Sequence, residues 1–156
     1  MSDVLHFWVS GIPKPQPRVK ACRRGNHASV YDPGTADGWK LLVTNGVNTH
    51  WNRVQFTGPL RLVLAFVMPR PRAHYNRHGD VKHNAPAWFE KRPDIDNLAK
   101  AVMDAMTQTQ VWRDDSQVVQ LEIGKGYGSR SGCFVVLGSA SSTDPLLKLD
   151  FRRFLA

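Results

Sequence analysis

The stretch GPLRLVLAFVMP, from Gly58 to Pro69, is the clearest strand in the sequence. Apolar residues fill both sets of alternating positions, namely Leu60, Leu62, Leu64, Phe66 and Met68 on one side and Val63, Ala65 and Val67 on the other. Because successive side chains of a strand point to opposite faces, this pattern predicts a strand that is covered on both faces. Such a strand lies inside a sheet, and the other elements are expected to pack around it.

Further segments show the periodicity of regular structure. Val4–Ser10 is rich in β-branched and aromatic residues and predicts a strand. Apolar residues at helical spacing predict helices over about 36–51 and about 97–107. Residues 116–128 and 132–138 predict two strands joined as a hairpin. The resulting order, β-α-β-α-β-β, indicates an α+β fold with a small mixed sheet and two main helices packed on it.

The connecting segments are long and polar. Residues 11–35 are rich in proline, glycine and cations, which predicts a loop with room for an edge-strand segment. Residues 70–92 form a second polar loop, and a loop this long in a small domain is typically functional or disordered. The chain is expected to divide into a domain over 1–138 and a tail over 139–156, made of a linker and a short amphipathic segment. Docking of the tail on the body and docking on a partner both remain open.

The charge is distributed unevenly. The net charge is +8 and the sequence pI is about 9.9. Residues 1–93 carry 14 Lys and Arg against 5 Asp and Glu, whereas residues 94–156 carry 7 against 8. A basic surplus of this size indicates a polyanionic partner, and a solvated basic surface is the alternative.

Other features bear on the compartment. The sequence has no apolar run long enough for a transmembrane helix, and its first 20 residues lack the pattern of a secretory signal. Cys22 and Cys133 lie far apart and show no metal-binding spacing. We therefore expect reduced thiols in a cytoplasmic protein.

The acids concentrate in one window, KRPDIDNLAKAVMDAMTQTQVWRDDSQVV, from Lys91 to Val119. Asp94 and Asp96 project to one face if the backbone before the helix is extended. Lys100 follows Asp96 by four residues, which puts it one helical turn along the same face. The pair Asp114–Asp115 opens the next strand and adds a third carboxylate if that strand returns beside Asp94.

Clustered carboxylates repel one another unless a cation lies among them. Three oxygen ligands without a thiolate suit a hard ion such as Mg²⁺, or Mn²⁺ in its stead, which binds substrate phosphate and activates water. A nearby lysine neutralises the charge that develops on the phosphate. The structural alternative is that an Asp before a helix caps it and that an Asp pair before a strand forms a turn.

These residues resemble the RusA family of Holliday-junction resolvases, which are common in phages and prophages. The segments that carry the resemblance are RPDIDNLAKAVMDAM and VWRDDSQVV, with further likeness in GIPKPQPRVK, VYDP and FVMPRPRAHY. The resemblance covers about residues 7–137, and the tail after about Gly138 falls outside it. The long, histidine-bearing loop over 70–92 departs from the pattern, so the substrate preference of the family need not transfer.

The resemblance implies a homodimeric, Mg²⁺-dependent, structure-selective endodeoxyribonuclease. Such an enzyme resolves four-way DNA junctions by paired symmetric nicks in DNA recombination and repair, and a two-fold dimer suits a two-fold junction. The metal carboxylates of the family match Asp94, Asp96 and Asp115, and its catalytic lysine matches Lys100. Asp114 matches a secondary acidic position. The implied catalytic set is therefore Asp94, Asp96, Lys100 and Asp115.

Cations outside this window are expected to contact the DNA backbone. The candidates are Lys14, Arg18, Lys20, Arg23, Arg24, Arg70, Arg72, Lys91 and Arg92. Lys125 and Arg130, near a glycine-rich turn, are weaker candidates for DNA contact. For the first loop, the alternative is a basic, flexible segment without a ligand.

Rings form a further group of candidates. Tyr75, Trp88, Phe89 and Trp112 could stack on bases or pack in the protein, and Trp112 is favoured as a core residue. The three histidines of the 70–92 loop, His74, His78 and His83, are expected to be solvated or to contact phosphate, with a zinc site as the alternative.

Two rival functions remain open on the sequence alone. The first is a metal-dependent nuclease that prefers forks, flaps or other branched DNA. The second is a non-catalytic, basic DNA-binding protein whose aspartates only cap helices and form turns.

Overall fold

The structure, a computed structural model, describes residues 3–148 and 150–155. Within these two ranges, no helix combines the length and the apolar character needed to cross a membrane. Cys22 and Cys133 both carry free thiols, as their spacing predicted.

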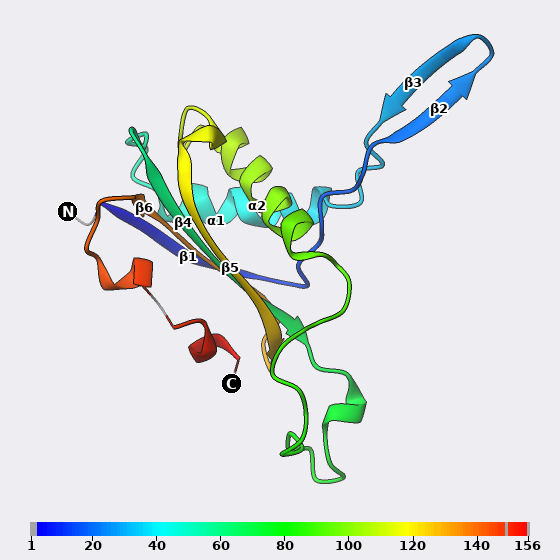
Figure 1. Cartoon of the computed structure of the whole chain (residues 1–156), viewed down its shortest axis with the longest axis vertical. Coiled ribbons are helices and arrows are strands. Elements are labelled where there is room, and N and C mark those ends of the chain that lie inside the picture. Colours follow the sequence, from blue (N-terminus) through cyan, green and yellow to red (C-terminus); the bar gives the residue numbers. More distant parts are fainter. Residues whose placement is uncertain (1–2, 149, 156) are drawn as a thin grey trace.

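A four-stranded sheet forms the centre of the molecule (Figure 1). Its strands are β1 (Val4–Ser10), β4 (Leu60–Pro69), β5 (Val118–Gly128) and β6 (Gly132–Ser139), in the spatial order β1-β6-β4-β5. β4 runs parallel to β5 and antiparallel to β6, so the sheet is mixed. Seven consecutive β4 residues, 62–68, are buried, which confirms the prediction of a central strand covered on both faces.

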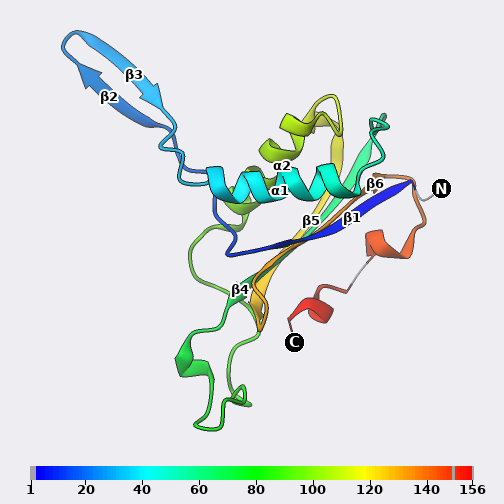
Figure 2. The ribbon, with the colours of Figure 1, turned by 180° about the vertical axis from the view of Figure 1, so that it is seen from behind.

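Both main helices cover the same face of the sheet (Figure 2). α1 (Asp37–His50) and α2 (Ile95–Thr109) pack against each other and confirm the predicted α+β class. Their apolar stripes are buried in the main core, through Trp39, Val43, Val47, Leu98, Val102 and Met106.

The predicted hairpin between the last two strands is wrong. β6 pairs with β1 and β4, whereas β5 pairs with the other side of β4. The connection over 129–131 therefore crosses the end of β4. Burial explains this arrangement, because β6 is apolar and almost fully buried, while residues 119–122 of β5 are exposed at an edge. The apolar strand β6 therefore lies in the interior of the sheet, between β1 and β4. A simple hairpin would have placed it next to β5.

Helix α2 begins at Ile95, two residues before the predicted start. Asp94 is the last extended residue, with φ −70° and ψ 142°, and Asp96 lies in the first helical turn. The two carboxylates are therefore neighbours at the start of a helix, and the predicted alternation along an extended segment does not apply.

The first polar segment contains a β-hairpin where a loop was expected. β2 (Lys20–Arg24) and β3 (His27–Tyr31) form a separate two-stranded sheet that projects from the body (Figure 1). Arg24 pairs with His27, so Gly25 and Asn26 form a two-residue turn in which Gly25 has φ +61°. A Gly-Asn pair is a recognised signal for such a turn.

The tail docks on the body of the molecule. Two short 3-10 helices, η3 (Pro145–Lys148) and η4 (Phe151–Phe154), lie on the sheet face opposite the main helices (Figure 2). Leu147 is buried there in a small cluster with residues of β1, β4 and β6. Phe154 stacks on Phe134 at 4.9 Å between ring centroids. The tail thus covers the second face of the sheet.

Candidate active site at the start of helix α2

Asp94 and Asp96 are exposed at the N-terminal end of α2. Asp94 occupies the N-cap position, but its side chain makes no capping hydrogen bond. Within the described residues, no hydrogen bond or ion pair engages either carboxylate. Asp94 therefore makes no capping hydrogen bond, although both acids lie where they favour the helix dipole. Their carboxylate oxygens are available to a ligand.

Lys125 of β5 holds the segment that leads to Asp94. Its Nζ donates hydrogen bonds to the carbonyl oxygens of Lys91 at 2.6 Å and Pro93 at 2.7 Å. The ammonium also lies 5.2 Å from the centre of the Phe89 ring. A charged donor shared by two carbonyls fixes the backbone on the approach to the helix. Lys125, a weak candidate for DNA contact, is thus engaged within the protein, and sequence reasoning missed this anchoring role.

The proline-rich N-terminal segment lies against the same helix end. The amide of Gln16 donates to the carbonyl oxygen of Asn97 at 2.8 Å, which fixes the segment to α2. Between them lies a hollow of about 650 Å³. Its charged lining residues are Lys14, Arg18, Arg92 and Asp94. The hollow therefore joins one free carboxylate to three of the predicted DNA-binding cations.

Lys100 lies one turn beyond Asp96 on an exposed part of the helix. Its Nζ is 3.4 Å from Oδ1 of Asp104, and Lys40 approaches the same carboxylate at 3.8 Å. The Lys100 side chain is 60% exposed, and exposed pairs of this kind are weak. The ammonium can therefore leave Asp104 at little cost and turn toward the start of the helix.

Asp114 and Asp115 lie at the other end of α2. The helix has 15 residues and is thus about 22 Å long. Strand β5 starts beside the beginning of β4 and only at Lys125 reaches the segment before Asp94. The expected return of Asp115 beside Asp94 is therefore not observed within one copy of the chain. No group of three His, Cys, Asp or Glu side chains among the described residues is arranged to hold a metal.

The two neighbouring aspartates differ in their local contacts. Oδ1 of Asp114 accepts a hydrogen bond from the amide of Ser116 at 2.8 Å, and the side chain of Gln117 completes a capping box. Hydrogen bonding by the side chain and the backbone amide of Ser116 holds the pKa of Asp114 below its usual value. The turn alternative thus holds for Asp114, whereas the Asp115 side chain takes no part in the capping box.

The histidines of the 70–92 loop are dispersed. His74 packs edge-on against Tyr127 at 4.7 Å between ring centroids. Desolvation lowers the pKa of His74, and the nearby charges of Arg70 and Lys91 lower it further. His78 instead accepts a hydrogen bond from Arg77. The alternative of a zinc site receives no support from the described residues.

The aromatic candidates differ in burial and contacts. Trp112 is 1% exposed and donates from Nε1 to Thr107, so it is a core residue as favoured. Trp88 is 51% exposed and stacks on Phe151 of the tail. Phe89 packs edge-on against a ring of β5.

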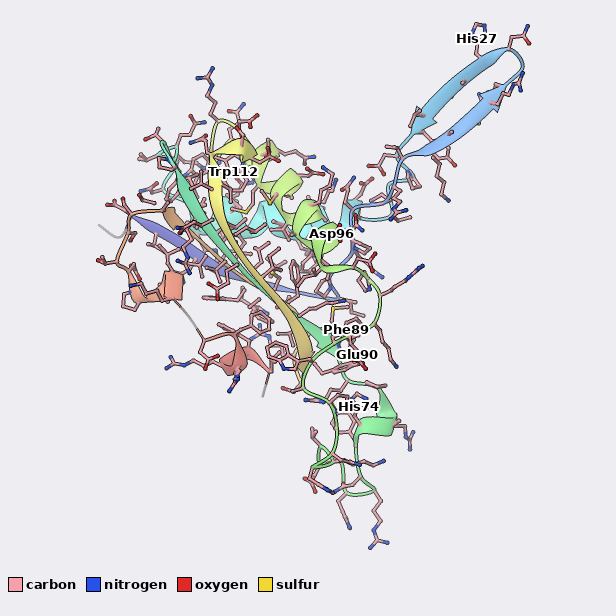
Figure 3. The ribbon with its side chains drawn as sticks, in the orientation of Figure 1. His27, His74, Phe89, Glu90, Asp96 and Trp112 are labelled. Carbon is pink, nitrogen blue, oxygen red and sulfur yellow. The ribbon has the colours of Figure 1, made fainter. Side chains whose placement is uncertain are left out.

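Figure 3 shows Asp96 at the helix start between two projections, the β2–β3 hairpin that carries His27 and the 70–92 loop that carries His74. The nine predicted DNA-binding cations are divided among the hollow, the segment around it and these projections. Lys14, Arg18 and Arg92 line the hollow, and Lys91 precedes Arg92. Arg70 donates to the carbonyl oxygen of Pro86 at 2.8 Å, so it also has a structural contact. Two projections carry the remaining four: Lys20, Arg23 and Arg24 on the β2–β3 hairpin and Arg72 in the 70–92 loop.

Comparisons with known proteins point to one family. The family described as Endodeoxyribonuclease RusA matches residues 10–137. The uncharacterized protein YqaN of Bacillus subtilis (strain 168) is 27% identical over 142 residues, covering 90% of this chain and 99% of that protein. The crossover junction endodeoxyribonuclease rusA of Lactococcus phage r1t is 50% identical over 38 residues, covering 24% of this chain and 29% of that protein.

Proposed function

Because the chain belongs to the RusA family of endodeoxyribonucleases, we propose that it resolves four-way DNA junctions by paired, symmetric, Mg²⁺-dependent nicks. As a member of this family the protein is an enzyme that hydrolyses phosphodiester bonds, of the crossover-junction type. The role that follows is in DNA recombination and repair, in the cytoplasm of a cell or of a phage-infected host.

The observation that carries the proposal is the pair of unengaged carboxylates at the start of α2. Asp94 and Asp96 expose oxygen ligands of the kind that Mg²⁺ and Mn²⁺ prefer, beside a hollow lined by Lys14, Arg18 and Arg92. A basic surface with an acidic pocket suits a nuclease, because cations bind the DNA backbone and carboxylates bind the metal. The residues present therefore fit a divalent ion.

The chemistry divides among these residues. A bound Mg²⁺ supplies an activated water and neutralises charge at the scissile phosphate. Asp94 and Asp96 hold the ion, while the cations of the hollow orient the strand. Lys100 turns from Asp104 toward the phosphate and stabilises the charge that develops there.

Asp115 completes this set only from a second copy of the chain, since α2 separates it from Asp94 in its own copy. The outer edge of β5 offers a surface for such a homodimer. No described strand pairs with this edge over 118–123, and Val119 and Leu121 are 60% and 44% exposed. Antiparallel pairing of two β5 edges centred near Gln120 brings Asp115 of the second copy to the level of Lys125.

A cleavage assay on synthetic DNA tests the proposal. The wild-type protein is incubated with a four-way junction, a flap and a linear duplex of matched arms, each with and without Mg²⁺. Paired nicks at symmetric positions in the junction, and only with the metal, are expected. Equal or faster cutting of the flap would move the assignment to other branched DNA. Tight binding without nicks under Mg²⁺ or Mn²⁺ would leave a DNA-binding protein.

A further inference from the structure

The 70–92 loop is a fixed projection that leaves the body next to the candidate site (Figure 1). Tyr75 and Val81 form an antiparallel bridge, and the amide of Lys82 donates to the carbonyl oxygen of His74 at 2.9 Å. At the base, the Arg70 contact with Pro86 ties the two limbs of the loop together. The loop is therefore built as a hairpin-like arm.

The tip of this arm is held by Asn76. Its Oδ1 accepts hydrogen bonds from the amides of His78 at 2.8 Å and Asp80 at 3.0 Å. The amide of Asn76 also donates to the carbonyl oxygen of Asp80 at 2.8 Å, and Gly79 adopts φ +89° within the turn. An asparagine that bonds its own turn in this way orders the backbone before any ligand arrives.

A hollow of about 470 Å³ lies at this ordered tip. It is lined by Arg72, Tyr75, Asn76, Arg77 and Gly79, and thus by two guanidinium groups. The neighbouring carboxylate of Asp80 accepts a hydrogen bond from Nδ2 of Asn76 at 3.3 Å and is not among the lining groups. Among the described residues, no ion pair engages Arg72 or Arg77. Arg77 uses Nε toward His78 at 3.2 Å, which leaves its terminal amino groups available.

Two unpaired guanidinium groups beside a tyrosine suit a phosphate, because the planar donor fork matches its oxygens. Both limbs of the arm reach the candidate site. Met68, just before the arm, lines the hollow at Asp94, and the returning limb runs through Phe89 to Pro93. Figure 3 shows His74, Phe89 and Asp96 succeeding one another from the arm to the helix. A DNA strand at Asp94 thus has the arm beside it.

We propose that Arg72 and Arg77 form a phosphate-binding site that holds the backbone of a DNA arm at a distance from the scissile bond. The inference rests on the proposed function, since it takes the ligand to be the branched DNA that the acidic pair cuts. The Arg72/Arg77 site adds a second point of contact with the DNA. Only a junction whose arm is long enough to reach this site gains the additional affinity.

The test measures the affinity of wild type and Arg72→Gln/Arg77→Gln for four-way junctions of decreasing arm length, without divalent metal. On long arms the double variant is expected to bind about tenfold more weakly. Its log-log salt slope should be shallower by about two units, because two phosphate contacts are lost. On arms too short to reach the tip, the two proteins should bind equally. Arg152→Gln/Arg153→Gln removes two exposed tail cations and should leave the arm-length dependence unchanged.

Equal affinities of wild type and the Arg72/Arg77 variant at all arm lengths would overturn the inference, as would a loss that does not depend on arm length. The site could also bind free phosphate instead of the phosphates of DNA. Titration of the protein with inorganic phosphate at matched ionic strength tests this. Binding of free phosphate by wild type, combined with no arm-length effect on DNA, would mark a free-anion site instead. Nicking is scored separately under Mg²⁺. An absence of nicks with the arm-length effect preserved would count against the proposed reaction and leave the phosphate site standing.

Discussion

One pair of aspartates lies at the start of helix α2 and another lies five residues past its end, and the two pairs differ in what they contact. At the C-terminal end, Asp114 accepts the amide of Ser116 and caps a short 3-10 helix. At the N-terminal end, Asp94 occupies a capping position without capping, and Asp96 is equally unengaged. An aspartate bound to its own backbone stabilises the fold, whereas the free pair beside the cations of the hollow is the one that we propose binds a metal ion. Contacts distinguish the two, although the residue type is the same.

The largest effect is expected from the free pair. Asp96→Asn and Asp94→Asn should each reduce Mg²⁺-dependent nicking by on the order of 10³-fold, because each removes a charged ligand that stabilises the transition state. Junction binding should persist, since cations supply it. Rates of nicking under single-turnover conditions measure the effect, and Asp3→Asn, at an exposed aspartate just before β1, is the control. Normal nicking by Asp96→Asn would remove the metal assignment.

Lys100 should give the next largest effect. Lys100→Met is expected to slow nicking by about 10²-fold at unchanged junction affinity, because it removes one electrostatic donor at the phosphate. Lys100→Arg should recover part of the rate, since it retains the charge. If Lys100→Met instead lowers the affinity for the junction and leaves the nicking rate of the bound junction unchanged, Lys100 contacts the DNA backbone and does not act in the reaction.

A change at Lys125 should lower the stability of the protein through the segment that precedes Asp94. Lys125→Met leaves the carbonyls of Lys91 and Pro93 without their donor, and the expected loss of unfolding free energy is about 2 kcal/mol. Denaturant titration measures this loss, and Lys125→Arg provides the charge-retaining control. Unchanged stability in the methionine variant would show that the segment before Asp94 is held by other contacts.

Asp114 should give the smallest effect. Asp114→Ala should lower the thermal midpoint slightly at pH 7, through the lost cap, and leave nicking unchanged. Because the folded-state pKa of Asp114 lies below its ordinary value of 3.8, its contribution is present above that pH and is lost as the pH falls through the folded-state pKa. The difference between Asp114→Ala and wild type should therefore vanish in acid. Thermal melts of both proteins across pH 2–7 follow it, and a constant difference would exclude the cap as its cause.

Periodic segments could be predicted well from the sequence. β4 and α1 lie where their apolar patterns placed them, because burial alone decides such elements. The order of strands could not be predicted in the same way. Residues 129–131 look like a hairpin turn, yet the choice of neighbour depends on which strand most needs an interior position. The strand order depends on the burial of all four strands, so it cannot be predicted from the residues of the turn alone.

The candidate site was predictable in part for a similar reason. The spacing of Asp96 and Lys100 fixes their common helix face, whichever way the helix packs. The distance from Asp94 to Asp115 depends on where β5 starts, and a helix of 15 residues lies between them. The roles of Gln16 and Lys125 arise from contacts distant in sequence, for which the local pattern carries no signal.

Subunit mixing tests most directly whether the two ends of α2 meet between copies of the chain. Asp96→Asn and Asp115→Asn proteins are assayed alone and after exchange of subunits, on a four-way junction with Mg²⁺. Neither should cut alone, and the mixture should produce single nicks, because a mixed dimer has one site with all three carboxylates intact. No nicks from the exchanged mixture, under conditions in which wild type cuts, would contradict a shared site and require Asp94, Asp96 and Asp115 to act separately.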